Sequence, residues 1–241
     1  MASFITLKKT PIKEIIFTIS FKENVELEKL ENFKSLPKIT ETFPICNKGF
    51  NAQVEAISDQ EAPTTKVSSD GFILKDKSPH SYLIQARRGS FSFHKVNGYE
   101  SFEDLIIQLK TYWDLFIEVS GQLTVVNLSV RYLNFIEQSK DEKINDLITI
   151  NTTHPFGAIK TNFTQHQFRY DKNPDIVVNV VTAIGQDGEK NGIVLDIILN
   201  KRIEINKELT FDFTSFNDMR TVKNEMFFKS ITEHTIKKYN Q

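Results

Sequence analysis

The sequence predicts an α+β protein in which an antiparallel sheet carries two long helices on one face. Apolar and polar residues alternate in many short segments, which is the period of a β-strand. The period lengthens to three or four residues in two long segments, about 101–119 and 215–238, as it does in amphipathic helices. With 241 residues, 39% of them hydrophobic, the chain can bury a substantial core. We therefore expect a single domain spanning residues 1–241.

The first predicted strand is Ile12–Phe21, where apolar residues alternate strictly. Its expected core-facing residues are Ile15, Phe17, Ile19 and Phe21. Val25–Thr42 follows as short helical pieces broken at Pro37, and Phe43–Ile57 as a second strand. The polar segment Ser58–Ser69 is predicted to be a loop within the domain.

The helix at about 101–119 has the strongest pattern in the sequence. Three short β-runs precede it: Phe72–Lys75, Ser81–Arg87 and Ser90–Val96. Ser101 is its predicted N-cap, paired with Asp104 three residues later. Gly121 suits the left-handed residue that ends many helices.

A long strand is predicted at Leu123–Glu137 after this helix. Strands followed by a helix then occur a second time, with three further strands at Asn162–Tyr170, Ile176–Ile184 and Ile193–Ile205. The final helix, about 215–238, has Ser215 as its expected N-cap, and its start resembles that of the first helix. Either two well-capped helices look alike by chance, or a β-meander-plus-helix unit is duplicated, with halves 1–137 and 138–241.

Composition argues against several classes of protein. Lys and Arg total 30 and Asp and Glu total 31, so the basic excess typical of nucleic-acid binders is missing. One cysteine, Cys46, provides neither a disulfide nor a thiolate zinc cage, and the five histidines lack metal-site spacing. We therefore expect no metal and no cofactor. Without a signal peptide or an apolar run of membrane length, the sequence predicts a cytoplasmic protein.

Three charged residues interrupt apolar strands and mark the candidate site: Glu14, Arg131 and Asp196. A buried charge is costly without a partner, so each predicts one, and Glu14–Arg131 is the expected pair. The pair either fixes the strand register or lines a polar cleft. In such a cleft, Arg131 and Asn134 would bind a small anion or a peptide carboxylate.

A second, smaller group of residues is basic and lies near a predicted hairpin. Arg87, Arg88 and Lys95 alternate there with Tyr82, Phe91 and Phe93. Aromatic and basic side chains together can stack single-stranded nucleic acid. The simpler interpretation has the aromatic rings in the core and the arginines in solvent.

The same residues carry a family resemblance. Thr10–Ile16 resembles the N-terminal Pro-Pro-hydrophobic-x-Glu motif of a sporadically distributed, uncharacterised bacterial and archaeal family, although Thr10 replaces the first proline. Val130–Ile136 is similar to its Arg-Tyr-x-Asn strand, Val194–Ile197 to its Leu-Asp strand and Met226–Thr232 to its C-terminal helix. The resemblance implies no activity. It implies an association with mobile-element cargo such as defence or toxin–antitoxin genes.

Three function classes stay open. The missing catalytic signature favours a non-enzymatic interaction or regulatory protein. Such a protein would bind a protein partner or form a homodimer, and the resemblance implies a defence or toxin–antitoxin system as its setting. The second class is a small-molecule sensor with a polar cleft around Glu14 and Arg131. The third is an enzyme whose dispersed site combines Glu14, Asp196 and a histidine.

Overall fold

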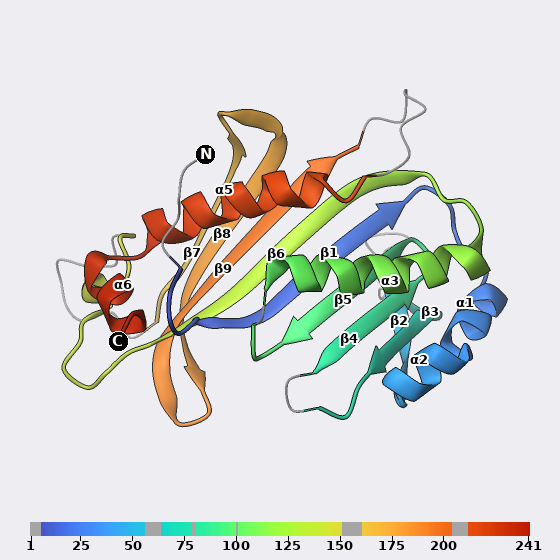
Figure 1. The fold of residues 1–241 in the computed structure, drawn as a ribbon, viewed down its shortest axis with the longest axis horizontal. Helices are drawn as coiled ribbons and strands as arrows, with labels where there is room; N and C mark the ends of the chain where they lie inside the picture. The colour runs from blue at the N-terminus through green and yellow to red at the C-terminus, as the bar shows by residue number, and fades with distance from the viewer. Residues whose placement is uncertain (1–5, 56–63, 79–80, 100, 151–160, 204–211) are drawn as a thin grey trace.

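The computed structural model describes residues 6–55, 64–78, 81–99, 101–150, 161–203 and 212–241, which form one antiparallel sheet with helices packed against it (Figure 1). The nine strands of the sheet lie in the order β2-β3-β4-β5-β1-β6-β9-β8-β7. Its strands are β1 (Ile12–Phe21), β2 (Ile45–Glu55), β3 (Thr64–Lys75), β4 (Tyr82–Arg87), β5 (Ser90–Val96), β6 (Val125–Glu137), β7 (Phe163–Tyr170), β8 (Asn173–Asp187) and β9 (Lys190–Arg202). Its helices are α1 (Leu27–Lys34), α2 (Pro37–Thr42), α3 (Phe102–Ser120), α4 (Ile144–Leu147), α5 (Ser215–Ser230) and α6 (Glu233–Tyr239). The large antiparallel sheet and the α+β class match the prediction.

Strands β1 and β6 pair with each other at the centre of the sheet. From β1 the chain passes through α1 and α2 to the edge strand β2, and it returns strand by strand to β5 beside β1. From β6 it passes through α4 to the other edge strand, β7, and returns through β8 to β9 beside β6. Each of these two strand series is followed by a helix: α3 follows β5, and α5 follows β9.

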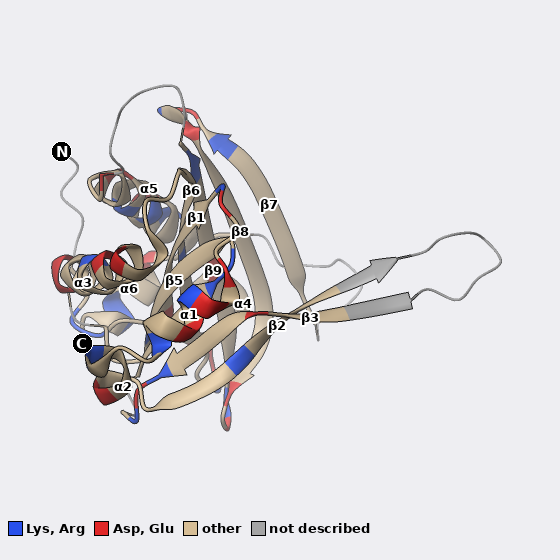
Figure 2. Ribbon diagram, turned by 90° about the vertical axis from the view of Figure 1, so that its right-hand side faces the viewer, with Lys and Arg blue, Asp and Glu red and all other residues tan. Residues whose placement is uncertain are grey.

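The core lies between the sheet and these helices. Ile15, Phe17, Ile19 and Phe21 are at most 5% exposed, as their alternation predicts. The ring of Phe17 contacts Phe102 of α3 and Phe216 of α5, so both helices lie over the same face of the sheet (Figure 2). We call this the covered face, and the opposite one the open face.

The first long helix has the predicted ends. The Ser101 side chain accepts a hydrogen bond from the Asp104 amide at 3.1 Å. Gly121 follows the last turn with a φ of 85°, in the region that favours glycine. Among the described residues, no helix has both the length and the apolar composition that crossing a membrane requires.

Two predicted elements need correction. Part of the predicted loop Ser58–Ser69 is strand: Thr64–Ser69 belongs to β3 and pairs with Phe50–Glu55 of β2, while residues 58–63 lie outside the described ranges. Threonine and valine favour strands, and pairing with β2 extends the hairpin into a polar sequence.

The predicted helix 215–238 is two helices. The chain breaks at Ile231, which forms an isolated bridge with Ile148, and Thr232 then caps α6 by accepting from the Thr235 amide. The N-cap of α5 is Thr214 and not Ser215, which is the first helical residue. Periodicity did not reveal this break because apolar residues continue through it.

Candidate functional site

The predicted ionic residues lie on the open face, but their pairing differs from the prediction. Arg131 donates from Nε and Nη2 to both oxygens of Asp196, at 3.0 and 2.7 Å. The Asp196 side chain is 8% exposed and that of Arg131 is 43% exposed. Fork-like pairing of this kind is the strongest geometry for a guanidinium and a carboxylate.

Glu14 pairs with His94, whose Nδ1 lies 2.8 Å from Oε1 of Glu14. The predicted Glu14–Arg131 pair is therefore wrong. Glu14 and Asp196 both lie opposite Leu133, one on each side of β6, so both are diagonal neighbours of Arg131. Glu14 is engaged by His94 of β5, whereas Asp196 presents its carboxylate from β9 to both donor groups of Arg131. The pKa of Arg131 is raised first by the hydrogen bonds that it donates to Asp196, and the charge of Glu14 contributes least. Arg131 and Glu14, the two charges of the predicted cleft, are therefore each engaged by another partner within the described protein.

Asn134, the third residue of the predicted cleft, lies on the other face of the sheet. This residue is 1% exposed on the covered face, where its amide donates to the carbonyl oxygens of Tyr132 and Leu195. Side chains alternate between the two faces along a strand. Asn134 and Arg131 are three positions apart, so they lie on opposite faces and cannot share a cleft.

The predicted basic group does not form a basic patch. Arg87 pairs with Asp70 at 2.9 Å, and Arg88 donates to the carbonyl oxygen of Val25. Lys95 is 4% exposed, with its ammonium 4.1 Å from the centre of the Tyr82 ring. Phe91 and Phe93 are fully buried, as the simpler interpretation expects.

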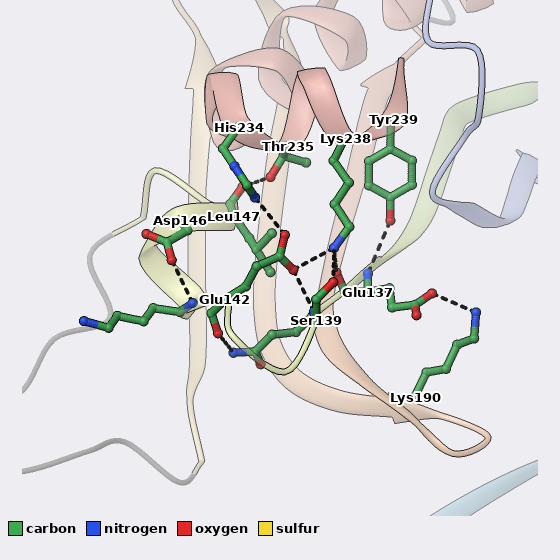
Figure 3. Close-up of polar contacts among 12 residues, drawn as sticks. Glu137, Ser139, Glu142, Asp146, Leu147, Lys190, His234, Thr235, Lys238 and Tyr239 are labelled. Atoms are coloured by element: carbon green, nitrogen blue, oxygen red, sulfur yellow. Dashed lines mark hydrogen bonds and ion pairs between the residues drawn. The ribbon is translucent and has the colours of Figure 1, made fainter. Parts of the chain in front are cut away.

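A dense polar cluster holds the C-terminal helix to the end of β6 (Figure 3). Glu142 accepts hydrogen bonds from Lys238 Nζ and the Ser139 amide, at 2.6 and 2.7 Å, and its other oxygen lies 2.7 Å from His234 Nε2. Burial alone would raise the pKa of Glu142, but these partners outweigh it and lower the pKa to about 2. Glu142, Lys238, Ser139 and His234 thus satisfy one another, and we call this cluster, which has a structural role, the Glu142 clasp.

The covered face holds a cavity of about 500 Å³ between the segment before β1, the sheet and α5. Its lining combines aliphatic and aromatic side chains with amides, hydroxyls and two cations. These residues are Thr6, Leu7, Thr10, Pro11, Ile12, Tyr99, Asn134, Asn217, Arg220, Thr221, Lys223, Asn224, Phe227 and Phe228. This volume is typical of small-molecule sites, and so is the mixed lining.

Lys223 is the central charged group of this cavity. Its Nζ lies 4.2 Å from the centre of the Tyr132 ring, over a fully buried tyrosine of β6. The residue keeps some accessible surface because it lines the cavity. Burial of the ammonium, with a smaller contribution from the charge of Arg220, lowers the pKa of Lys223 to about 7. Among the residues that the structure describes, no carboxylate pairs with this ammonium.

The other cation is already paired. Arg220, one turn before Lys223, forms an ion pair with Glu103 of α3, and its guanidinium lies 4.7 Å from the centre of the Phe102 ring. Below Lys223, the buried hydroxyl of Tyr132 has no hydrogen-bond partner within the described part of the chain. Burial also raises the pKa of this hydroxyl, so it stays neutral.

Sequence reasoning included Asn134 but missed Lys223, Arg220 and Tyr132. A signal was present: Phe216, Arg220, Lys223 and Phe227 follow one another at helical steps of three and four residues. Two cations on an apolar helix stripe need an explanation in the same way as a charge inside an apolar strand. The described residues contain no group of three or more possible metal ligands.

Comparisons with known proteins leave the family open. No protein-family model matches the chain, and a search of curated proteins finds no match, so the family resemblance described above stays a prediction. A search of solved structures finds similarity to the di-domain ARO/CYC StfQ from the steffimycin biosynthetic pathway. That match has 9% identity over 94% of this chain and 96% of the other, with a TM-score of 0.22, and is too weak to support an argument.

Proposed function

We propose that this protein is a small-molecule-binding domain whose cavity beneath α5 holds a compound with an acidic group and an apolar body. The observation that carries the proposal is the Lys223 ammonium, which faces a cavity of about 500 Å³ with no described carboxylate beside it. A buried charge without a protein partner is costly, and an acidic ligand would supply the missing partner. Phe227, Phe228 and Leu7 would contact the apolar body.

This proposal keeps the sensor class of function but moves its site. The cleft predicted around Glu14 and Arg131 would have used cations that the open face has already neutralised. The covered face provides the concave shape and the unpaired charge, with Asn134 as the shared residue.

The experiment is a calorimetric screen of small aliphatic and aromatic carboxylic acids against the full chain. We expect at least one acid to bind, and Lys223→Met to weaken its binding about tenfold or more, which is the usual effect of losing a charged hydrogen-bond donor. Lys229→Met is the matched control, because Lys229 lies on the same helix, is 70% exposed and pairs with Glu225. Equal binding by wild type and Lys223→Met would contradict the proposal.

We further propose that the chain consists of two copies of one unit: a central strand, a meander that returns from the sheet edge, and a covering helix. The strand order supports this, and the boundary would fall near Gly121, not at the predicted 137/138. Under α3 the space is filled by aromatic rings: Tyr112, Trp113 and Phe116 pack on Phe91 and Phe93. Only the unit with α5 would then keep a ligand cavity.

Protein interaction is the second candidate function, and the edge strand β7 favours it. Phe163 is 68% exposed and Phe168 is 39% exposed on this strand, which pairs with β8 and has no strand on its other side among the described residues. Such an edge can pair with a strand of another protein, as a regulatory, defence or antitoxin role would require. Cross-linking in the native host would test it: loss of the partner in Phe163→Lys would support this role, and an unchanged partner would contradict it.

A further inference from the structure

The amine of Lys223, which lines the cavity, can carry chemistry beyond binding. Arg131, Glu142 and Arg87 each have an oppositely charged partner within the described protein. Lys223 differs from them in three ways: it lines a cavity, it lies over the ring of Tyr132, and the charged group that acts on its pKa is another cation, Arg220.

We propose that Lys223 is a nucleophile that forms an imine with a small carbonyl compound carrying an acidic group, such as a 2-oxo acid. The proposal rests on the proposed function in one respect, that the cavity is the ligand site. It goes beyond that function by making the contact covalent and by naming the carbonyl group as the part of the ligand that reacts.

The surroundings of Lys223 favour its neutral, reactive form. A lysine becomes nucleophilic when it is removed from water or placed beside another cation, and both conditions hold here. The pKa of Lys223 is lowered to about 7, so about half of the amine is neutral at pH 7. The ionisable groups that surround it are Arg220 on its own helix, Tyr132 from β6, Tyr99 from the segment before α3, and Glu103, which is engaged by Arg220.

The step needs no reactant other than the carbonyl compound and a proton from water. The lone pair of Lys223 Nζ attacks the carbonyl carbon, an N–C bond forms, and the C=O π pair moves to oxygen. The nitrogen then loses one proton and the oxygen takes up one, which gives a carbinolamine. A second proton from solvent lets the C–O bond break, the oxygen leaves as water, and the nitrogen pair closes the C=N bond. The protonated imine keeps the positive charge of the ammonium that it replaces, so the acidic group of the ligand retains a cationic neighbour.

The experiment uses the full chain with glyoxylate, which is the smallest compound that combines an aldehyde and a carboxylate. Sodium cyanoborohydride reduces any imine to a stable carboxymethyl-lysine, and peptide mass spectrometry measures the extent of labelling at each lysine. We expect Lys223 to be labelled at least about tenfold faster than Lys229 at pH 7, because an ordinary lysine is almost fully protonated there. The rate at Lys223 should level off above about pH 7.

Two controls separate this proposal from the binding function. Lys223→Arg should lose the adduct at residue 223 without changing labelling at Lys229. 3-Phenylpropanoate, an acid without a carbonyl group, should block labelling at Lys223 alone.

Each outcome decides one of the two proposals. Labelling of Lys223 no faster than that of Lys229 would overturn the imine, even if acids bind in the calorimetric screen. Fast labelling that no acid can block would support the nucleophile and count against the acidic-ligand function. Fast labelling that 3-phenylpropanoate blocks would support both.

Discussion

The two faces of the sheet treat buried charge in opposite ways. On the open face, Asp196 has Arg131 and Glu14 has His94, each at hydrogen-bond distance. On the covered face, Lys223 lies over an aromatic ring and has no described carboxylate partner. A pair of opposite charges has a structural role in the fold, whereas an unpaired charge at a cavity indicates a ligand. The contrast shows that a charge in an apolar strand is a weaker sign of function than a charge that remains without a partner after folding.

Removing Arg131 is the change with the largest expected effect. Arg131→Met leaves the carboxylate of Asp196 buried without a partner, so the free energy of unfolding should fall by roughly 3 kcal/mol. Urea denaturation measures it. The double variant Arg131→Met/Asp196→Leu should recover most of the loss, because both charges are then gone. Lys110→Met is the control, since the exposed Lys110–Asp114 pair should contribute under about 1 kcal/mol. An Arg131→Met protein as stable as wild type would show that Asp196 does not need Arg131, and the contrast between the two faces would then fail.

On the covered face, removing a charge is expected to raise the free energy of unfolding and not to lower it. Lys223→Met removes an unpaired ammonium and should stabilise the empty protein by about 2 kcal/mol at pH 6, allowing for solvent in the cavity. The pKa of Lys223 is about 7 in the folded state and higher in the unfolded state. Between pH 7 and about 10 the unfolded chain therefore binds more protons, and wild type should gain stability relative to the variant as pH rises.

Denaturation at several pH values checks this sign. The difference in unfolding free energy between wild type and Lys223→Met should become smaller from pH 7 to pH 10. The difference between wild type and the exposed Lys229→Met control should stay constant. A gap that does not change with pH would mean that Lys223 is solvated, and the two faces would then not differ.

The smallest expected effect concerns the two covering helices. Ser101 caps α3 with a side-chain hydrogen bond, whereas Thr214 makes no such bond to α5. Ser101→Ala should therefore cost about 1 kcal/mol of unfolding free energy, and Thr214→Ala only a few tenths. Thermal denaturation of both variants measures the difference. Equal losses would show that α5, which covers the cavity, is held at its start as firmly as α3.

Much of the fold could be predicted from the sequence because its signals are local. Alternation placed Phe17 and Ile19 in the core, and the Ser101 and Gly121 signals placed both ends of α3. The break at Ile231 could not be predicted, because it depends on a bridge to Ile148, 83 residues earlier in the chain.

The site was harder to predict than the fold. The sequence showed that Arg131 and Asp196 need partners, but the choice of partner depends on which strands flank β6 and on His94 beside Glu14, and alternation encodes neither. Lys223 looks like an ordinary helix lysine in the sequence. Its position over Tyr132 arises only when α5 packs across β6, and that contact joins residues about ninety positions apart.

The central position of β1 has a consequence for synthesis of the chain. Phe17 pairs with Phe93 on one side and with Val130 on the other, so β1 receives its second neighbour only after about a hundred further residues have been made. Until then Ile15, Phe17 and Ile19 form an apolar strand with a free edge, which is the type of segment that aggregates. Pairings so distant in sequence also slow folding, because a long loop must close before any contact forms. We therefore expect the nascent chain to depend on chaperones until β6 has emerged.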